Sequence, residues 1–187
     1  MTAIHNHVLR GNPATFYMHV GGHGDAEKLA TGIRTALAAS KTPLEAPPQA
    51  APAPVDLDTA KLDEIIGAKG QANGGVYQFG VPRREPITEA GMAITPPRPM
   101  GVATAIGFQP IGGGKAAITG DFVLLGEEVN PVIRVLRQNG IEVTAIHSHM
   151  LTEQPRLIFM HFWANDDALK LARGLREALD KTARTKS

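Results

Sequence analysis

The sequence contains no cysteine among its 187 residues. Disulfide frameworks, thiolate metal sites and thiol nucleophiles are therefore excluded together. Any metal ion that the chain binds must be held by nitrogen and oxygen ligands.

Net charge and long apolar runs are also lacking. The chain has 19 basic and 18 acidic residues, a formal net charge of +1, which gives no general attraction to phosphate backbones, so nucleic acid is not an expected partner. No apolar run approaches the ~18 residues that a membrane span needs.

The opening residues, Met1 to His5, lack the basic and apolar regions of a secretory signal, so the sequence as written predicts a cytoplasmic protein. A periplasmic or exported protein is the alternative if the native start lies upstream.

An internal repeat is the strongest feature of the sequence. The segment TAIHNH at Thr2–His7 reappears as TAIHSH at Thr144–His149, 142 residues later. The same offset aligns, without a gap, Pro13 with Pro155, Met18-His19 with Met160-His161, Asp25 with Asp167, and Lys28-Leu29-Ala30 with Lys170-Leu171-Ala172. We interpret the chain as two copies of one structural unit.

The two copies are unequal in length. The second match is preceded by two apolar runs and a helix-like segment, whereas nothing precedes the first match. We therefore predict the C-terminal part of a first unit over residues 1–42, a linker rich in proline and alanine over residues 43–56, and a complete second unit over residues 57–187. A truncated chain is one explanation. A genuine one-and-a-half-unit protein would leave an open sheet edge, which a homodimer would cover.

Each copy follows the order strand, turn, strand, helix. Residues 142–150 and 157–163 are rich in β-branched and aromatic residues, and the turn-like segment 152–155 separates them, which favours an antiparallel hairpin. Asp166 or Asp167 is placed to cap the helix that follows. The pattern predicts an α+β fold in which helices cover one face of an antiparallel sheet.

A further helix is predicted upstream of the second hairpin. Glu127-Glu128 favour its first turn, and Gly140 stands where the glycine after a helix belongs. Pro131 is expected to be tolerated only in the first turn of this helix.

The repeated motif carries six of the seven histidines in the chain. His147 and His149 alternate along one strand and so project to the same side of it. If the hairpin turns around residue 154, His161 lies opposite His147 on that same face. The three imidazoles would then converge like the ligands of three-histidine zinc sites, which leave a fourth coordination position open.

The first copy repeats this spacing with His5, His7 and His19. We expect both sets to bind a divalent transition metal, zinc first and copper as the alternative. The competing interpretation is that these histidines are hydrogen-bonded residues that only orient the hairpin.

A carboxylate could complete such a site or serve as its base. The two candidates are Glu153, in the predicted hairpin turn, and Asp121, in a strand that could lie beside the hairpin. Asp121 is equally well explained as a turn or bulge residue, and Glu153 as a solvated side chain.

The strings HNHVL, YMHVGGHGD, GDFVLLGEEVNPVIRVLRQNGIEVTAIHSHML and PRLIFMHFW resemble the LppY/LpqO family over nearly the full chain. The resemblance implies a bacterial protein with two related units, an extracytoplasmic location in many members, and no established reaction. Members usually have a full first unit and a leader, and this sequence has neither.

Three functions remain open at this point. The first is a metal-binding protein for storage, sensing or structure. The second is an enzyme, a metal-dependent hydrolase or lyase, that uses the open coordination position. The third is a metal-free module that holds a small anion or a partner protein.

Overall fold

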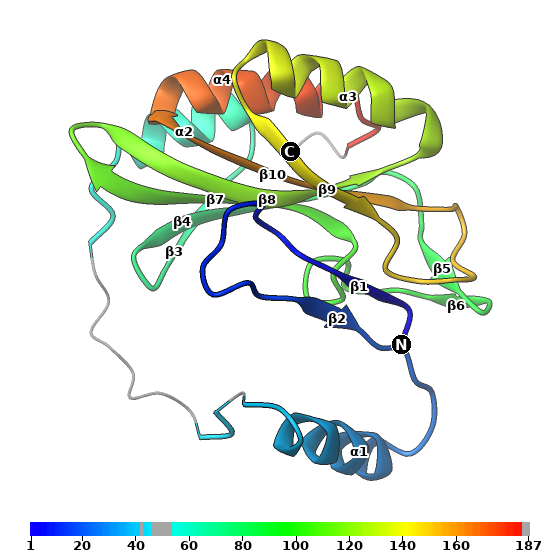
Figure 1. Ribbon diagram of the computed structural model, residues 1–187. Helices are drawn as coiled ribbons and strands as arrows, with labels where there is room; N and C mark the ends of the chain where they lie inside the picture. The colour runs from blue at the N-terminus through cyan, green and yellow to red at the C-terminus, as the bar shows by residue number, and fades with distance from the viewer. Residues whose placement is uncertain (42, 46–53, 185–187) are drawn as a thin grey trace.

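The computed structural model describes residues 1–41, 43–45 and 54–184. Its centre is a six-stranded antiparallel sheet with the strand order β3-β4-β7-β8-β10-β9 (Figure 1). The strands are β3 (Gln71–Asn73), β4 (Val76–Pro82), β7 (Ala103–Gly112), β8 (Lys115–Leu124), β10 (Ile158–Asp167) and β9 (Glu142–His147). A separate short pair, β5 (Thr88–Glu89) and β6 (Met92–Ala93), lies in the connection between β4 and β7.

Three helices cover one face of the sheet (Figure 1): α2 (Thr59–Ile66), α3 (Gly126–Gln138) and α4 (Ala168–Leu179). The main core lies between these helices and the sheet, and it includes Phe79, Phe108, Phe122, Phe162, Leu136 and Leu175. Each fully buried side chain of this size stabilises the fold by about 1.5–3 kcal/mol relative to its exposed state. The predicted α+β fold with helices on one face is confirmed.

The sequence predicted a capping residue for one helix and a terminal glycine for another, and both are confirmed. The Asp167 carboxylate accepts a hydrogen bond from the Lys170 backbone N–H at 2.7 Å and so caps α4. Gly140 follows α3 with a φ of 72°, which glycine adopts without steric cost. Among the described residues, no helix is both long and apolar enough to cross a membrane.

The prediction for Pro131 was wrong. The helix α3 begins at Gly126, so Pro131 is its sixth residue and lies beyond the first turn. The carbonyl that loses a helical hydrogen bond to this proline is that of Glu127, an exposed residue in the first turn. Because water can reach that carbonyl, the proline costs less here than in the middle of a helix.

A small hairpin lies on the other face of the sheet, opposite the three helices (Figure 1). It consists of β1 (Ala3–His5) and β2 (Tyr17–His19), and we call residues 2–19 the first hairpin. The Thr144 hydroxyl donates to the His7 backbone carbonyl at 2.6 Å, and Arg10 pairs with Glu142 at 2.7 Å. These contacts attach the first hairpin to β9. The helix α1 (Ala26–Ala38) follows it, and all its residues are exposed.

The strand pairing in the first hairpin recurs between β9 and β10. Ala3 pairs with His19 and His5 with Tyr17, while Ala145 pairs with His161 and His147 with Phe159, so every partner is shifted by 142 residues. That both segments are copies of one unit stays a prediction, as do the boundaries at residues 42 and 57. The predicted linker over residues 43–56 falls largely outside the described residues.

The predicted register of the second hairpin was wrong by two residues. His147 faces Phe159 instead of His161. The connection over residues 148–157 is not a tight turn, because Gln154 exchanges two backbone hydrogen bonds with Thr88, at 2.8 and 2.9 Å. A shift of two residues leaves each side chain on its original face of the sheet, so His147 and His161 still share a face.

Candidate metal centre

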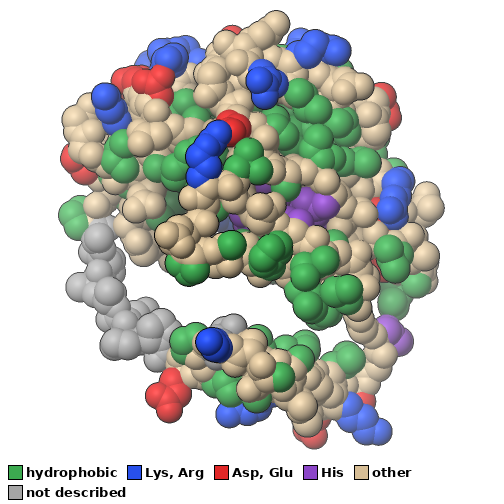
Figure 2. Space-filling model, viewed as in Figure 1, with side chains coloured by type: hydrophobic (Ala, Val, Ile, Leu, Met, Phe, Trp, Pro, Cys, Tyr) green, Lys and Arg blue, Asp and Glu red, His purple; other side chains and the backbone are tan. Residues whose placement is uncertain are grey.

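Six histidines meet where the first hairpin packs on the sheet. His147 and His161 come from β9 and β10, and His149 follows β9 by two residues, while His5, His7 and His19 come from the first hairpin. Part of this histidine cluster reaches the molecular surface, where it is visible in purple in Figure 2. The two copies of the motif therefore face each other across one interface.

The rings stack in pairs that cross this interface. The centroids of His5 and His147 are 3.5 Å apart, those of His7 and His161 3.8 Å, and those of His19 and His149 3.7 Å. An aromatic ring closes each end of the stack, because Tyr17 lies 3.5 Å from His7 and Phe159 lies 3.5 Å from His149. His7 and His149 are thereby each held between two rings.

Several ring nitrogens in the cluster are buried without a hydrogen-bond partner among the described residues. They include the Nε2 atoms of His19, His147 and His149. These three histidines can each offer one ligand atom, and the three ligand atoms lie within 4.8 Å of one another. A buried polar atom left without a partner costs about 1–3 kcal/mol. A cation between them would remove that cost.

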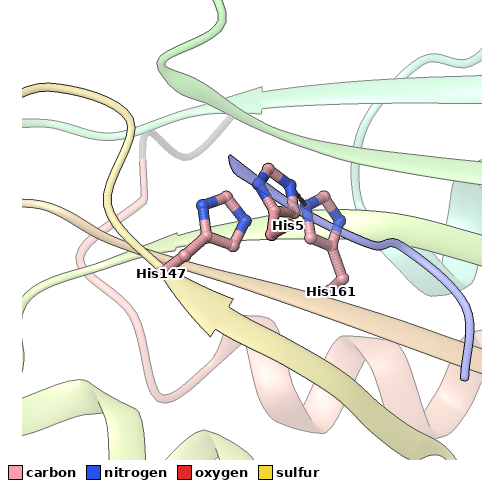
Figure 3. A group of neighbouring side chains, drawn as sticks. All are labelled: His5, His147 and His161. Carbon is pink, nitrogen blue, oxygen red and sulfur yellow. Dashed lines mark hydrogen bonds between the residues drawn. The ribbon is translucent and has the colours of Figure 1, made fainter. Parts of the chain in front are cut away.

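A second group of ligands consists of His5, His147 and His161 (Figure 3). The Nε2 atoms of His5 and His161 are 3.0 Å apart and share a hydrogen bond, drawn as the dashed line in Figure 3. The Nδ1 atom of His161 lies 3.0 Å from the Gly120 carbonyl and donates to it, which leaves its Nε2 with a free lone pair in the neutral ring. A carbonyl that fixes the tautomer in this way is typical of metal-binding histidines.

The imidazoles are set to be uncharged at neutral pH. Burial and the neighbouring histidines lower the pKa of His7, His147 and His161 to about 4 and that of His149 to about 2. Burial also lowers the pKa of His5 and His19. Neutral imidazole is the form that binds a metal ion.

Asp121 on β8 stands beside this cluster. One of its carboxylate oxygens lies 3.5 Å from His149 Nε2 and the other 3.9 Å from His161 Nδ1. Asp121 forms a third group of ligand atoms with these two histidines. Burial raises the pKa of Asp121 to about 7, against a backbone hydrogen bond from Met160 that lowers it. A bound cation would favour its ionised form.

Glu153 has a different position. Its side chain is buried, whereas the sequence suggested a solvated side chain as the simplest alternative. One oxygen accepts from the Leu157 backbone N–H at 3.0 Å and the other from Arg156 at 3.1 Å. Because both oxygens are engaged within its own loop, and none of the ligand groups among the described residues includes it, Glu153 shapes the connection between β9 and β10.

The ligand groups combine the two copies of the motif. Sequence reasoning assigned one set of three histidines to each hairpin, but two of the three groups among the described residues draw ligands from both hairpins, and the third pairs second-hairpin histidines with Asp121. His7 belongs to none of these groups, although it stacks on His161. Spacing within a hairpin says nothing about which surface the hairpin packs on, so the sequence carried no signal for this mixture.

Comparison with known proteins yields a family and no functional precedent. No curated protein and no solved structure matches the chain. A family model described as Domain of Unknown Function (DUF1259) matches residues 1–39 and 60–181, and these segments contain all six clustered histidines and Asp121. Because the match covers most of its length, the chain belongs to the DUF1259 family.

Proposed function

We propose that this protein binds a divalent transition-metal ion between the first hairpin and the sheet, with His19, His147 and His149 as ligands. The observation that carries the proposal is the set of three buried Nε2 atoms that lack a hydrogen-bond partner among the described residues. They belong to histidines whose ligand atoms lie within 4.8 Å of one another. Neutral buried nitrogens that converge in this way are what a metal ion requires.

The donor set favours zinc, with copper as the second choice. Imidazole suits both metals, and three histidines leave a coordination position for water or another ligand. Hard cations such as Mg²⁺ and Ca²⁺ prefer oxygen ligands, and Asp121 is the only carboxylate in the three ligand groups of the described residues. Within the DUF1259 family, we place the chain with the LppY/LpqO proteins on the motifs quoted above.

Cobalt spectroscopy tests this proposal. Co²⁺ added to metal-free protein without an affinity tag should produce the visible absorption of a low-coordinate site, and Zn²⁺ should abolish it by displacement. The His149→Ala variant should give a clearly weaker signal, because the proposed ion loses one of its three ligands. The matched control is His23→Ala, because His23 is exposed and lies outside the cluster. Wild-type protein that gives no Co²⁺ signal and takes up no Zn²⁺ would contradict the proposal.

Asp121 favours a second candidate function, a metal-dependent hydrolase. Its buried carboxyl group, with a pKa raised to about 7, lies 3.5 Å from one of the proposed ligands. A metal-bound water at the open position would have a general base beside it. Metal-loaded protein should then hydrolyse one class among ester, phosphate and lactone substrates, and Asp121→Asn should slow the reaction by about 10²–10⁴-fold with metal still bound. Inactivity on all three classes would count against this function.

A further inference from the structure

The proposed ion does not use all the ligands in the cluster. A four-coordinate ion on His19, His147 and His149 has room for at most one more protein ligand. His5 and His161 would remain, with their Nε2 atoms 3.0 Å apart, and the Nδ1 atom of His5 is buried without a partner among the described residues. The cluster therefore has more converging nitrogens than one ion can bind, and without metal His5 and His161 satisfy each other through a hydrogen bond.

The geometry of the remaining pair suits a metal ion. Two nitrogens bound to one ion at about 2.0–2.1 Å are separated by about 2.8–3.4 Å for bond angles between about 90° and 109°. The 3.0 Å between His5 Nε2 and His161 Nε2 falls within this interval. Since the Gly120 carbonyl holds the proton of His161 on Nδ1, the Nε2 lone pair of His161 points toward His5.

The ring packing relates the histidines of the first hairpin to those of the second by an approximate two-fold symmetry. At the offset of 142 residues, His5 corresponds to His147, His7 to His149 and His19 to His161. The stacked pairs follow this correspondence, and His5 stacks on its own counterpart, His147. The pair of His7 and His161, with ring centroids 3.8 Å apart, corresponds to the pair of His149 and His19, with ring centroids 3.7 Å apart. The end rings Tyr17 and Phe159 correspond in the same way.

Applying this symmetry to the first set of ligands gives the second set. The counterparts of His19, His147 and His149 are His161, His5 and His7. We infer that the cluster holds two metal ions at once, the first on His19, His147 and His149 and the second on His5, His161 and His7. This inference rests on the proposed function, because it adds a second ion to the same interface.

His7 is the counterpart of His149 and lies beside the pair, although it belongs to none of the ligand groups among the described residues. Its ring lies against His161, and its backbone carbonyl accepts a hydrogen bond from Thr144 on β9 at 2.6 Å. In the absence of the first ion, His147 can complete the second position, since it forms a ligand group with His5 and His161. With the first ion on His147, the His7 side chain would have to turn to supply the third nitrogen.

Zinc stoichiometry separates this inference from the proposed function. Isothermal titration of Zn²⁺ into metal-free wild-type protein should give two equivalents per chain, with elemental analysis after desalting as a second count. The counterpart variants His7→Ala and His149→Ala should each keep one equivalent, and His23→Ala should keep two. In the wild type, bound Cu²⁺ should show magnetic coupling between two copper ions in electron paramagnetic resonance, and His7→Ala should abolish it.

The outcomes differ in what they overturn. A wild-type protein with one equivalent and no copper coupling overturns the second ion and leaves the proposed function standing. A wild-type protein with no bound metal contradicts both the second ion and the proposed function. Two equivalents retained in a folded His7→Ala variant exclude His7 as a ligand and overturn the second position. The wild-type count needs no variant, so a misfolded variant does not affect the test.

Discussion

At the residue scale, hydrogen bonds decide which atoms of the cluster are free to bind. The Gly120 carbonyl takes up the Nδ1 proton of His161, and the Nε2 atoms of His19, His147 and His149 are left without partners among the described residues. Outside the cluster, the buried carboxylate of Glu128 has hydrogen bonds to both of its oxygens. Both oxygens of Glu128 accept from Arg83, and they also accept from the backbone N–H groups of Leu125 and Ala183.

Glu128→Ala should therefore destabilise the protein strongly. It removes one partner of a buried ion pair and leaves the Arg83 guanidinium buried, for which a loss of about 3–5 kcal/mol in the free energy of unfolding is expected. Urea unfolding measures this loss. The control is Glu64→Ala, which breaks the exposed pair with Lys61 and should cost less than about 1 kcal/mol. Equal losses in the two variants would refute this account of the buried pair.

The metal-free protein should lose stability as the pH falls from about 6.5 toward 4. In the unfolded chain each histidine takes up a proton near its ordinary pKa of 6.5. In the folded chain the pKa of His7, His147 and His161 is lowered to about 4. The unfolded state thus binds more protons in this window, which lowers the free energy of unfolding. Asp121, with its raised pKa, makes the folded state more stable as the pH falls, but this single group is outnumbered by the histidines. Urea unfolding at pH 7, 5.5 and 4.5 checks this, and a constant stability would contradict it.

At the scale of elements, the first hairpin is attached to the sheet by few direct contacts. The pair of Arg10 with Glu142 is exposed and contributes little. The hydrogen bond from Thr144 to the His7 carbonyl, the hydrogen bond between His5 and His161, and the stacked histidines add to the described attachment. Metal ligands drawn from both sides of this interface would join the two elements.

Zinc should therefore slow amide hydrogen exchange in β1 and β2. Local opening of the first hairpin would have to break metal–nitrogen bonds when zinc is bound, so exchange through that opening is suppressed. Strand β4, on the far side of the sheet, is the internal control and should exchange at nearly the same rate with and without zinc. Hydrogen exchange with mass spectrometry gives both rates. Protection spread equally over β1, β2 and β4 would argue against a metal at this interface.

The elements themselves could be predicted from the sequence because their signals are local. The capping carboxylate of Asp167, the glycine at 140 and the β-branched and aromatic residues of β9 and β10 each act over a few residues. The register of β9 and β10 could not be predicted from the sequence. The connection between these strands is shaped by the bridge between Gln154 and Thr88, which are 66 residues apart. The pairing of the two histidine motifs across an interface depends on packing at still longer range.

At the scale of the whole molecule, α1 differs from its counterpart α4. Leu171 and Leu175 of α4 are at most 1% exposed, whereas the corresponding Leu29 and Ile33 of α1 are 37% and 51% exposed. An apolar helix face of this kind is typical of a surface that packs on another chain. We expect a homodimer through this face of α1, whereas the sequence suggested one that covers an open sheet edge. Light scattering of Ile33→Asp against wild type is the measurement. A wild-type monomer at high concentration would contradict this expectation.

The central claim is that the interface between the first hairpin and the sheet is a metal centre. Elemental analysis of the untagged protein, purified without chelators and without added metal, tests it most directly. The account predicts zinc or copper in at least one equivalent per chain, reduced in His149→Ala and unchanged in His23→Ala. A wild-type protein that contains no metal and takes up none when zinc and copper are added would contradict the account.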